Sequence, residues 1–160
     1  MLSVQLVQLI ERHADSLTHE VVEDLLSNEH TISFHGLSKT ELEPRILALY
    51  QHLGNCVVGC NEEVIKAEYE SWGTTRRGQG IPVSEIAYAL IITKQHLRRY
   101  IREHGSALAS GDRITKGEIL PLELYSIQQL NYAVGDFFDK ALYYLLRGYE
   151  MQGRVKHIGV

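Results

Sequence analysis

Apolar residues recur at helical spacing from the start of the chain. Between residues 3 and 28 they fall at steps of three and four, along one stripe of a helix whose other face is charged. The stripe is formed by Val7, Ile10, Ala14, Leu17, Val21 and Leu25. We therefore predict one helix from about Ser3 to Asn28, followed by a loop over the aperiodic segment NEHTISFHGLS.

A second helix is predicted near residue 40, where two S/T-x-x-E capping patterns overlap. One pattern starts at Ser38 and the other at Thr40. Pro44 favours Thr40 as the cap, because the proline then lies early in the helix and sacrifices only one hydrogen bond. The inward face of this helix is expected to consist of Ile46, Leu49, Tyr50 and Leu53.

A third helix is predicted from about Asn61 to Arg77, and a fourth begins at Pro82, where the missing N–H does no harm in a first turn. The fourth helix is apolar on two adjoining stripes, so we expect it to be buried on more than one side. These stripes are Ile86, Leu90, Thr93, Leu97 and Ile101, and Ala89, Ile92, His96 and Tyr100. After Gly105, the polar segment SALASGDRITKG predicts a long connection.

The fifth predicted helix is the longest, from about Leu120 to Met151, which corresponds to about 45 Å at 1.5 Å per residue. It is apolar on two faces, and the second face must be buried on something. A symmetric partner chain is the simplest source of such a surface. We therefore predict a homodimer whose interface contains Phe138, Leu142, Leu146 and Tyr149.

These elements predict an all-α fold, a five-helix bundle with a long C-terminal helix. The 160 residues, of which 44% are hydrophobic, suffice for one core. A net charge of −4 without a basic block argues against nucleic acid as a partner. The chain shows neither a basic leader nor a long unbroken apolar segment, so we expect a cytoplasmic protein that does not span a membrane.

His96 is the most distinctive candidate for chemistry, since an imidazole on an apolar face could bind a metal or haem, or change its charge near neutral pH. A histidine beside several arginines at the polar end of a helix is more typical of a hydrogen-bonded boundary residue, which is the interpretation we favour. The tyrosines of the last two helices suit a partly hydrated pocket for a small-molecule ligand. The residues predicted for it are Tyr88, His96, Tyr100 and Tyr132.

Two other patterns are candidates for metal or phosphate binding. Cys56 and Cys60 lie in a row with His52 on one helical face, but a closed zinc site requires four ligands, so we interpret the cysteines as packing residues. Arg76 and Arg77 precede glycines, yet no strand comes before them, and we expect a solvated helix end. No glycine-flanked serine or metalloprotease pattern occurs, which argues against an enzyme.

Four segments in succession carry a family resemblance: LIERHADSLTHEVVEDLLSN, LSKTELEPRILALYQHLG, GIPVSEIAYALIITKQHLRRYI and DFFDKALYYLLRGYE. Together they resemble the N-terminal domain of RsbRD-type proteins, the RsbT co-antagonists of bacterial stress signalling, which also heads some sensor histidine kinases. The resemblance implies a non-catalytic sensory or regulatory domain over residues 1–152, with 153–160 as a tail or linker toward an output domain of STAS or kinase type.

The resemblance also implies a globin-like dimer without haem, so no cofactor is predicted. Two features depart from the family pattern: Pro44 replaces an ordinary helix former, and the cysteine pair is not shared. The alternative is a haem- or metal-binding globin-type sensor with His96 as the axial ligand. Against it, His96 lies in the long fourth helix rather than in a short helix before the two long terminal ones.

Overall fold

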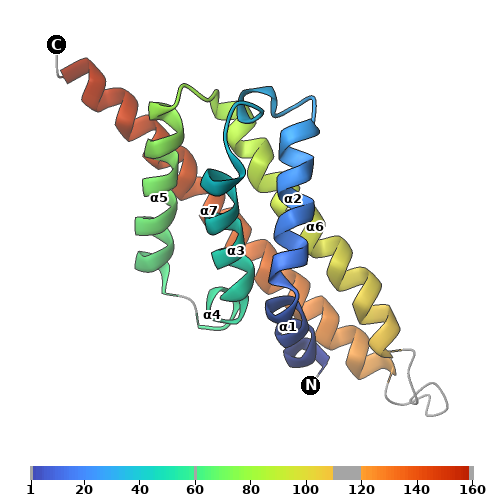
Figure 1. Cartoon of the computed structure of the whole chain (residues 1–160). Helices are drawn as coiled ribbons and strands as arrows, with labels where there is room; N and C mark the ends of the chain where they lie inside the picture. Colours follow the sequence, from blue (N-terminus) through green and yellow to red (C-terminus); the bar gives the residue numbers. More distant parts are fainter. Residues whose placement is uncertain (1, 60, 110–119, 159–160) are drawn as a thin grey trace.

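The computed structural model describes residues 2–59, 61–109 and 120–158 (Figure 1). Within these ranges every regular element is helical, which confirms the all-α prediction, but there are seven α-helices rather than five. The elements are α1 (Leu2–Arg12), α2 (Ala14–Ser27), the 3-10 turn η1 (Ile32–Phe34), α3 (Lys39–Gln51), α4 (Leu53–Val57), α5 (Glu62–Gly78), α6 (Val83–Ala109) and α7 (Leu120–Ile158).

The first predicted helix is wrong as a single element, because it breaks at His13 into α1 and α2. The backbone of His13 has φ −103° and ψ 21°, outside the helical region. Its ring Nδ1 lies 2.9 Å from the carbonyl oxygen of Leu9, and this local contact competes with regular helix geometry. Ile10 and Ala14 are both buried on either side of the break, so the apolar stripe continues across it.

The start of α3 also differs from the prediction. The helix begins at Lys39 with Ser38 as its N-cap, so Thr40 was the wrong choice. The Ser38 hydroxyl lies 2.8 Å from the Thr40 hydroxyl and does not cap a backbone N–H. Pro44 therefore lies well inside α3, where its missing N–H leaves the Thr40 carbonyl without its helical partner. At the other end, the helix stops at His52, and the short α4 follows.

The last three helices lie close to their predicted positions. Asn61 caps α5 by accepting a hydrogen bond from the backbone N–H of Glu63 at 3.0 Å, and α6 follows Pro82 directly. The helix α6 continues past Gly105 to Ala109, whereas residues 110–117 of the predicted connection lie outside the described residues. The helix α7 has 39 residues, continues beyond Met151 to Ile158, and extends past the other helices at its C-terminal end (Figure 1).

The apolar stripes of the helices meet in one core. The first predicted stripe of α6 is buried, with Leu97 0% exposed, and in the second Ile92 and His96 are buried while Ala89 and Tyr100 are half-buried. One buried polar link joins α3 to α6, where the Tyr50 hydroxyl donates to the Thr93 carbonyl at 2.8 Å. Burial raises the pKa of Tyr50 well above its usual value, so it stays a neutral donor. None of the helices in the described ranges is both long and apolar enough to cross a membrane.

Helices α5 and α7 approach each other closely at two glycines. A Cβ atom on Gly73 would collide with the backbone of Leu145, and one on Gly148 would collide with the backbone of Glu70. The two helices can lie this close only because these positions lack side chains. Hydrogen bonds cross the contact: the Thr74 hydroxyl donates to the Gly148 carbonyl at 3.2 Å, and Arg77 Nη1 donates to the Tyr149 carbonyl at 3.1 Å.

The residues predicted for a dimer interface are largely used within the chain. Phe138 is only 3% exposed and packs edge-on against Phe137 in the core. The ring of Tyr149 lies under the guanidinium of Arg77, 4.5 Å from centroid to Cζ. Leu142 and Leu146 are half-buried. On this face Phe138 thus belongs to the core and Tyr149 to the contact with α5, and the dimer itself stays a prediction.

The α5–α7 contact predicts a strong dependence on side-chain size. We expect Gly148→Ala to lower the free energy of unfolding by about 1–3 kcal/mol, because the new methyl group forces the helices apart. Gly135→Ala, on the same helix with open space around its Cβ, should instead raise it by about 0.5–1 kcal/mol. Urea unfolding of the two variants measures both effects, and equal stability would contradict the packing described.

Candidate functional site

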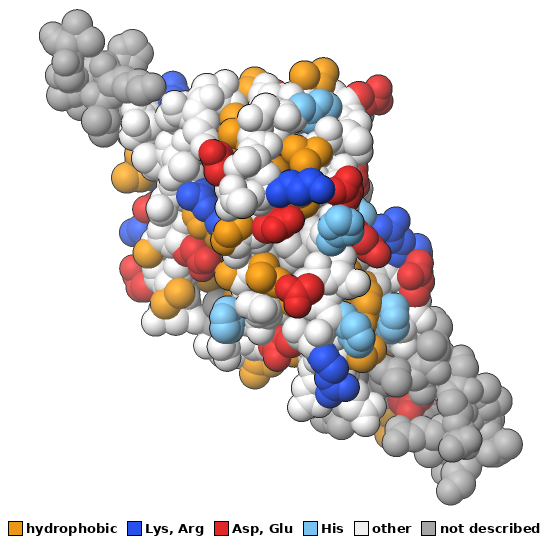
Figure 2. Space-filling model, in the orientation of Figure 1, with side chains coloured by type: hydrophobic (Ala, Val, Ile, Leu, Met, Phe, Trp, Pro, Cys, Tyr) orange, Lys and Arg blue, Asp and Glu red, His pale blue; other side chains and the backbone are white. Residues whose placement is uncertain are grey.

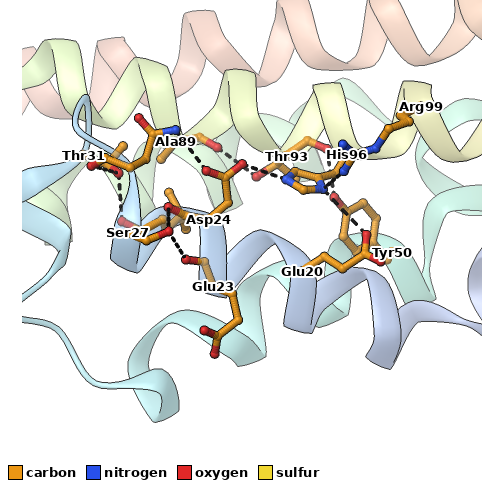
Figure 3. A network of polar contacts seen from close by, with 12 residues as sticks. Glu20, Glu23, Asp24, Ser27, Thr31, Tyr50, Ala89, Thr93, His96 and Arg99 are labelled. Atoms are coloured by element: carbon orange, nitrogen blue, oxygen red, sulfur yellow. Dashed lines mark hydrogen bonds and ion pairs between the residues drawn. The ribbon is translucent and has the colours of Figure 1, made fainter.

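His96 of α6 is held against α2 by two acidic side chains from the first part of the chain. Its Nε2 lies 2.8 Å from Oδ2 of Asp24, and its Nδ1 lies 3.7 Å from Oε2 of Glu20. Glu20 and Asp24 are four residues apart on α2 and so face the same side of that helix. Figure 3 shows both carboxylates pointing toward the imidazole, with Arg99 approaching it from α6. The side chain of His96 is 10% exposed.

Arg99 fixes the tautomer of the imidazole. Its Nη2 lies 2.7 Å from Nδ1 of His96, and since a guanidinium can only donate hydrogen bonds, Nδ1 must accept. The proton of neutral His96 is therefore on Nε2 and is donated to Asp24. Both ring nitrogens are engaged, as in a hydrogen-bonded boundary residue.

Asp24 is the anchor of this network. Burial alone would raise the pKa of Asp24, but hydrogen bonds from Asn28 and His96 and the charge of Arg99 outweigh it, so the pKa lies below its usual value. The Asn28 amide donates to Oδ1 at 2.9 Å, and His96 engages Oδ2. Asp24 thus remains ionised at neutral pH, with a partner on each oxygen.

A polar groove of about 480 Å³ adjoins the His96 network, between α1, α2 and α6. Tyr100 and His104 form one wall, with their rings stacked at 3.8 Å and an interplanar angle of 15°. The Tyr100 hydroxyl lies 3.4 Å from Nδ1 of His13 across the groove, and burial raises the pKa of Tyr100. Figure 2 shows histidine side chains along this side of the molecule. The groove offers imidazole, phenol, guanidinium and carboxylate groups to a small polar ligand.

The structure brings together only two of the four predicted pocket residues. His96 and Tyr100 line the groove. Tyr88 instead packs on His30, with ring centroids 4.8 Å apart, and Tyr132 is 62% exposed on α7. The prediction grouped them because they lie on the last two helices, but Tyr88 contacts the segment after α2, and Tyr132 lies on the exposed side of α7.

Other residues of the groove were missed by sequence reasoning. His13 and Glu20 of the groove, and Asp24 beside it as the partner of His96, come from the first quarter of the chain, and no local pattern links them to α6. His104 alone carried a usable signal, because it follows Tyr100 by one helical turn and aromatic pairs at that spacing meet.

The other candidate motifs have different environments from those expected. Arg76 is 8% exposed, so the prediction of a solvated helix end is wrong for this residue, which packs over the ring of Phe34. Cys56 is half-buried against the core, and Cys60 lies outside the described residues. No group of three or more His, Cys, Asp or Glu in the described part of the chain could hold a metal ion.

The network predicts a pH-dependent stability contribution from Asp24. We expect Asp24→Asn to lower the free energy of unfolding by about 1 kcal/mol at pH 7, since the charged hydrogen-bond acceptor is lost from a partly exposed site. Because the pKa of Asp24 is lowered in the folded chain, its stabilisation is present above the ordinary value of 3.8 and is lost as the pH falls below it. Urea unfolding of both proteins at pH 7 and near pH 3 checks this.

The difference between wild type and Asp24→Asn should shrink at the lower pH. Glu29→Gln, on an exposed residue outside the network, is the matched control and should show a smaller difference at either pH. A gap for Asp24→Asn that persists unchanged in acid would mean that its carboxylate charge is not what stabilises the contact.

Comparison with protein-family models, with curated protein sequences and with solved structures finds no match to this chain, so its family assignment remains the prediction drawn from the sequence resemblance.

Proposed function

We propose that this chain is a non-catalytic signal-input domain of a bacterial stress-response regulator or sensor histidine kinase. The observation that carries the proposal is the course of α7. This helix packs on α1, α4, α5 and α6 and then extends past them (Figure 1). A change in how the other helices pack can therefore move the C-terminal part of α7. This part of the helix is best placed to reach an output domain of STAS or kinase type.

The mechanism would be a shift between two ways in which the helices pack on α7. A ligand shifts such an equilibrium only if it binds the two states unequally. The groove beside His96 supports this idea, because its walls come from α1, α2 and α6, whose mutual positions a bound molecule can bias.

The proposed domain acts as a homodimer, and the exposed tyrosines of α7 offer the surface. Tyr125, Tyr132 and Tyr143 are 59%, 62% and 60% exposed. Their spacings of seven and eleven residues correspond to about two and three helical turns, so they share one stripe. Tyrosine supplies a large contact area and a polar hydroxyl. It therefore suits a surface that is exposed to water in the monomer and buried in the dimer.

Charges beside the stripe favour a second copy as the partner. A shallow depression between α6 and α7 is bordered by Lys94 and Arg98 on one side and by Asp136 and Asp139 on the other. A two-fold axis through this surface can place the basic side of one copy against the acidic side of its partner, and conversely. The surface is thus self-complementary in charge as well as rich in tyrosine.

Native mass spectrometry, with an absorption spectrum of the same sample, tests the proposed domain. We expect a dimer mass without an added group and without visible absorption. A mass increase that matches haem, together with a Soret band, would overturn the proposal in favour of the globin-type haem sensor. A monomer at every concentration would contradict the dimeric mechanism.

Tyr132→Glu should dissociate the dimer, because it places a charge in the centre of the tyrosine stripe beside Asp136. We expect the apparent dimer dissociation constant to rise by at least about tenfold, or about 1.4 kcal/mol. Val64→Glu is the control, since Val64 is similarly exposed, at 59%, but lies on α5. Sedimentation velocity measures both variants, and a Tyr132→Glu protein that dimerises like wild type would exclude this surface.

A further inference from the structure

A second pocket lies between the helices, away from the groove beside His96. It has a volume of about 60 Å³, is partly open to the surface, and is lined by α2, η1, α3, α5, α6 and α7. Figure 1 shows α3 between α2 and α5, with α6 and α7 behind them. Most of the lining is aliphatic and includes Leu42, Ile46, Ile86, Leu90 and Leu145. A purely aliphatic cavity of this size would hold only an apolar molecule.

Two arginines change the character of this cavity. Arg45 from α3 and Arg76 from α5 both line it. Arg76 is 8% exposed, and its guanidinium lies over the ring of Phe34, 5.6 Å from Cζ to centroid. Arg45 lies over the ring of Trp72 in the same way at 5.4 Å. The two aromatic faces support the guanidinium groups, but cation–π contacts leave the N–H donors at their edges free to bond elsewhere.

Neither arginine forms an ion pair within the described part of the chain. Among the described residues, no carboxylate lies within ion-pair distance of Arg45 or Arg76. Nη1 of Arg45 is buried and has no hydrogen-bond partner in the described structure. Nη1 of Arg76 donates to the side-chain oxygen of Gln79 at 2.9 Å, and Gln79 in turn donates to Glu41 at 3.2 Å. Glu41 therefore reaches Arg76 by a hydrogen-bond chain through Gln79 and by a longer-range attraction, which burial outweighs.

The electrostatic cost of this arrangement is visible in the lowered pKa of both guanidinium groups. Burial, reinforced by the charge of Arg45, lowers the pKa of Arg76 to about 10. Burial also lowers the pKa of Arg45, and the attraction of Glu68 and Glu41 only partly opposes it. A buried charge without a partner is unfavourable, and an unsatisfied buried donor adds to the cost. An anion in the cavity would relieve both.

We propose that this cavity is a binding site for a small organic monocarboxylate. Its carboxylate would lie between Arg45 and Arg76 and accept hydrogen bonds from both, including the unpaired Nη1 of Arg45. Its short aliphatic tail would fill the space among the apolar side chains. The site is distinct from the groove beside His96, and the inference does not depend on the proposed signalling role.

The shape and lining of the cavity select this class of ligand. With about 60 Å³, the pocket is smaller than the roughly 150 Å³ cavity that holds a benzene molecule, so it takes the carboxylate and the first carbon atoms of a ligand, and the end of the tail lies at its open side. Short-chain carboxylates, with butyrate as the longest, are of this size. Phosphate and sulfate would face aliphatic walls on most sides and lose their hydration without compensation. A planar carboxylate matches two guanidinium groups, and its tail gains from burial.

Trp72 gives a direct readout, because it is the single tryptophan of the chain and lines the cavity. The probe is butyrate, compared with butyramide, which has the same shape without the charge, and with inorganic phosphate. Titration of the full chain is followed by tryptophan fluorescence and by isothermal titration calorimetry. We expect saturable binding of butyrate below about 10 mM, and binding of butyramide and phosphate weaker by at least about tenfold.

Variants separate the site from general charge effects. Arg76→Gln should weaken butyrate binding by at least about tenfold, and Arg45→Gln should act in the same direction if the first variant folds poorly. Ala89→Leu keeps both arginines and fills the cavity with a larger side chain, so it should also abolish binding. Arg102→Gln, on an exposed arginine of α6, is the control and should bind butyrate like wild type.

Three results would overturn the inference: equal binding of butyrate and butyramide, unchanged butyrate affinity in both arginine variants, or no saturable change at Trp72 below about 10 mM. A dimer without haem but also without butyrate binding would leave the proposed signal-input role standing and remove only this site. Butyrate binding by a strictly monomeric chain would support this site and contradict the proposed dimeric signalling mechanism.

Discussion

The near contact between the backbones of α5 and α7 constrains the rest of the structure. Gly73 and Gly148 let the two helices approach until backbone meets backbone, and the bonds from Thr74 and Arg77 fix their relative positions. Since α5 is joined to α3 and α4 by a short segment, its placement on α7 determines which side chains it can present to the core. It is through this contact that Trp72 and Arg76 reach the cavity beneath α3.

Apolar burial and directional bonds have separate roles in this fold. The core is formed by aliphatic stripes, which favour close packing but leave helices free to slide or rotate. Three polar contacts remove that freedom: Asp24 with His96 sets α2 against α6, Tyr50 with Thr93 sets α3 against α6, and Thr74 with Gly148 sets α5 against α7. A hydrogen bond contributes only about 1 kcal/mol net, so these contacts matter chiefly for register.

What the sequence allowed us to predict follows from the range of each interaction. Helices α5, α6 and α7 were located closely, because periodicity and caps act over a few residues. The break at His13 was not located, because the apolar stripe continues across it just as it would in an unbroken helix. His96 stood out as a polar residue on an apolar face, but its partner Asp24 lies 72 positions earlier. Arg76 was misjudged because its burial depends on α3 and η1 rather than on its neighbours in sequence.

The position of Gly148 along α7 has a mechanical consequence. At 1.5 Å per residue, about 42 Å of helix precede Gly148 and about 15 Å follow it. If α7 tilts as a rigid rod about its tightest contact, that contact acts as a fulcrum with unequal arms. A displacement of the end near Leu120 then reaches Ile158 reversed in direction and reduced nearly threefold, so the helix would work as a lever that converts wide movements at one end into small, forceful ones at the other.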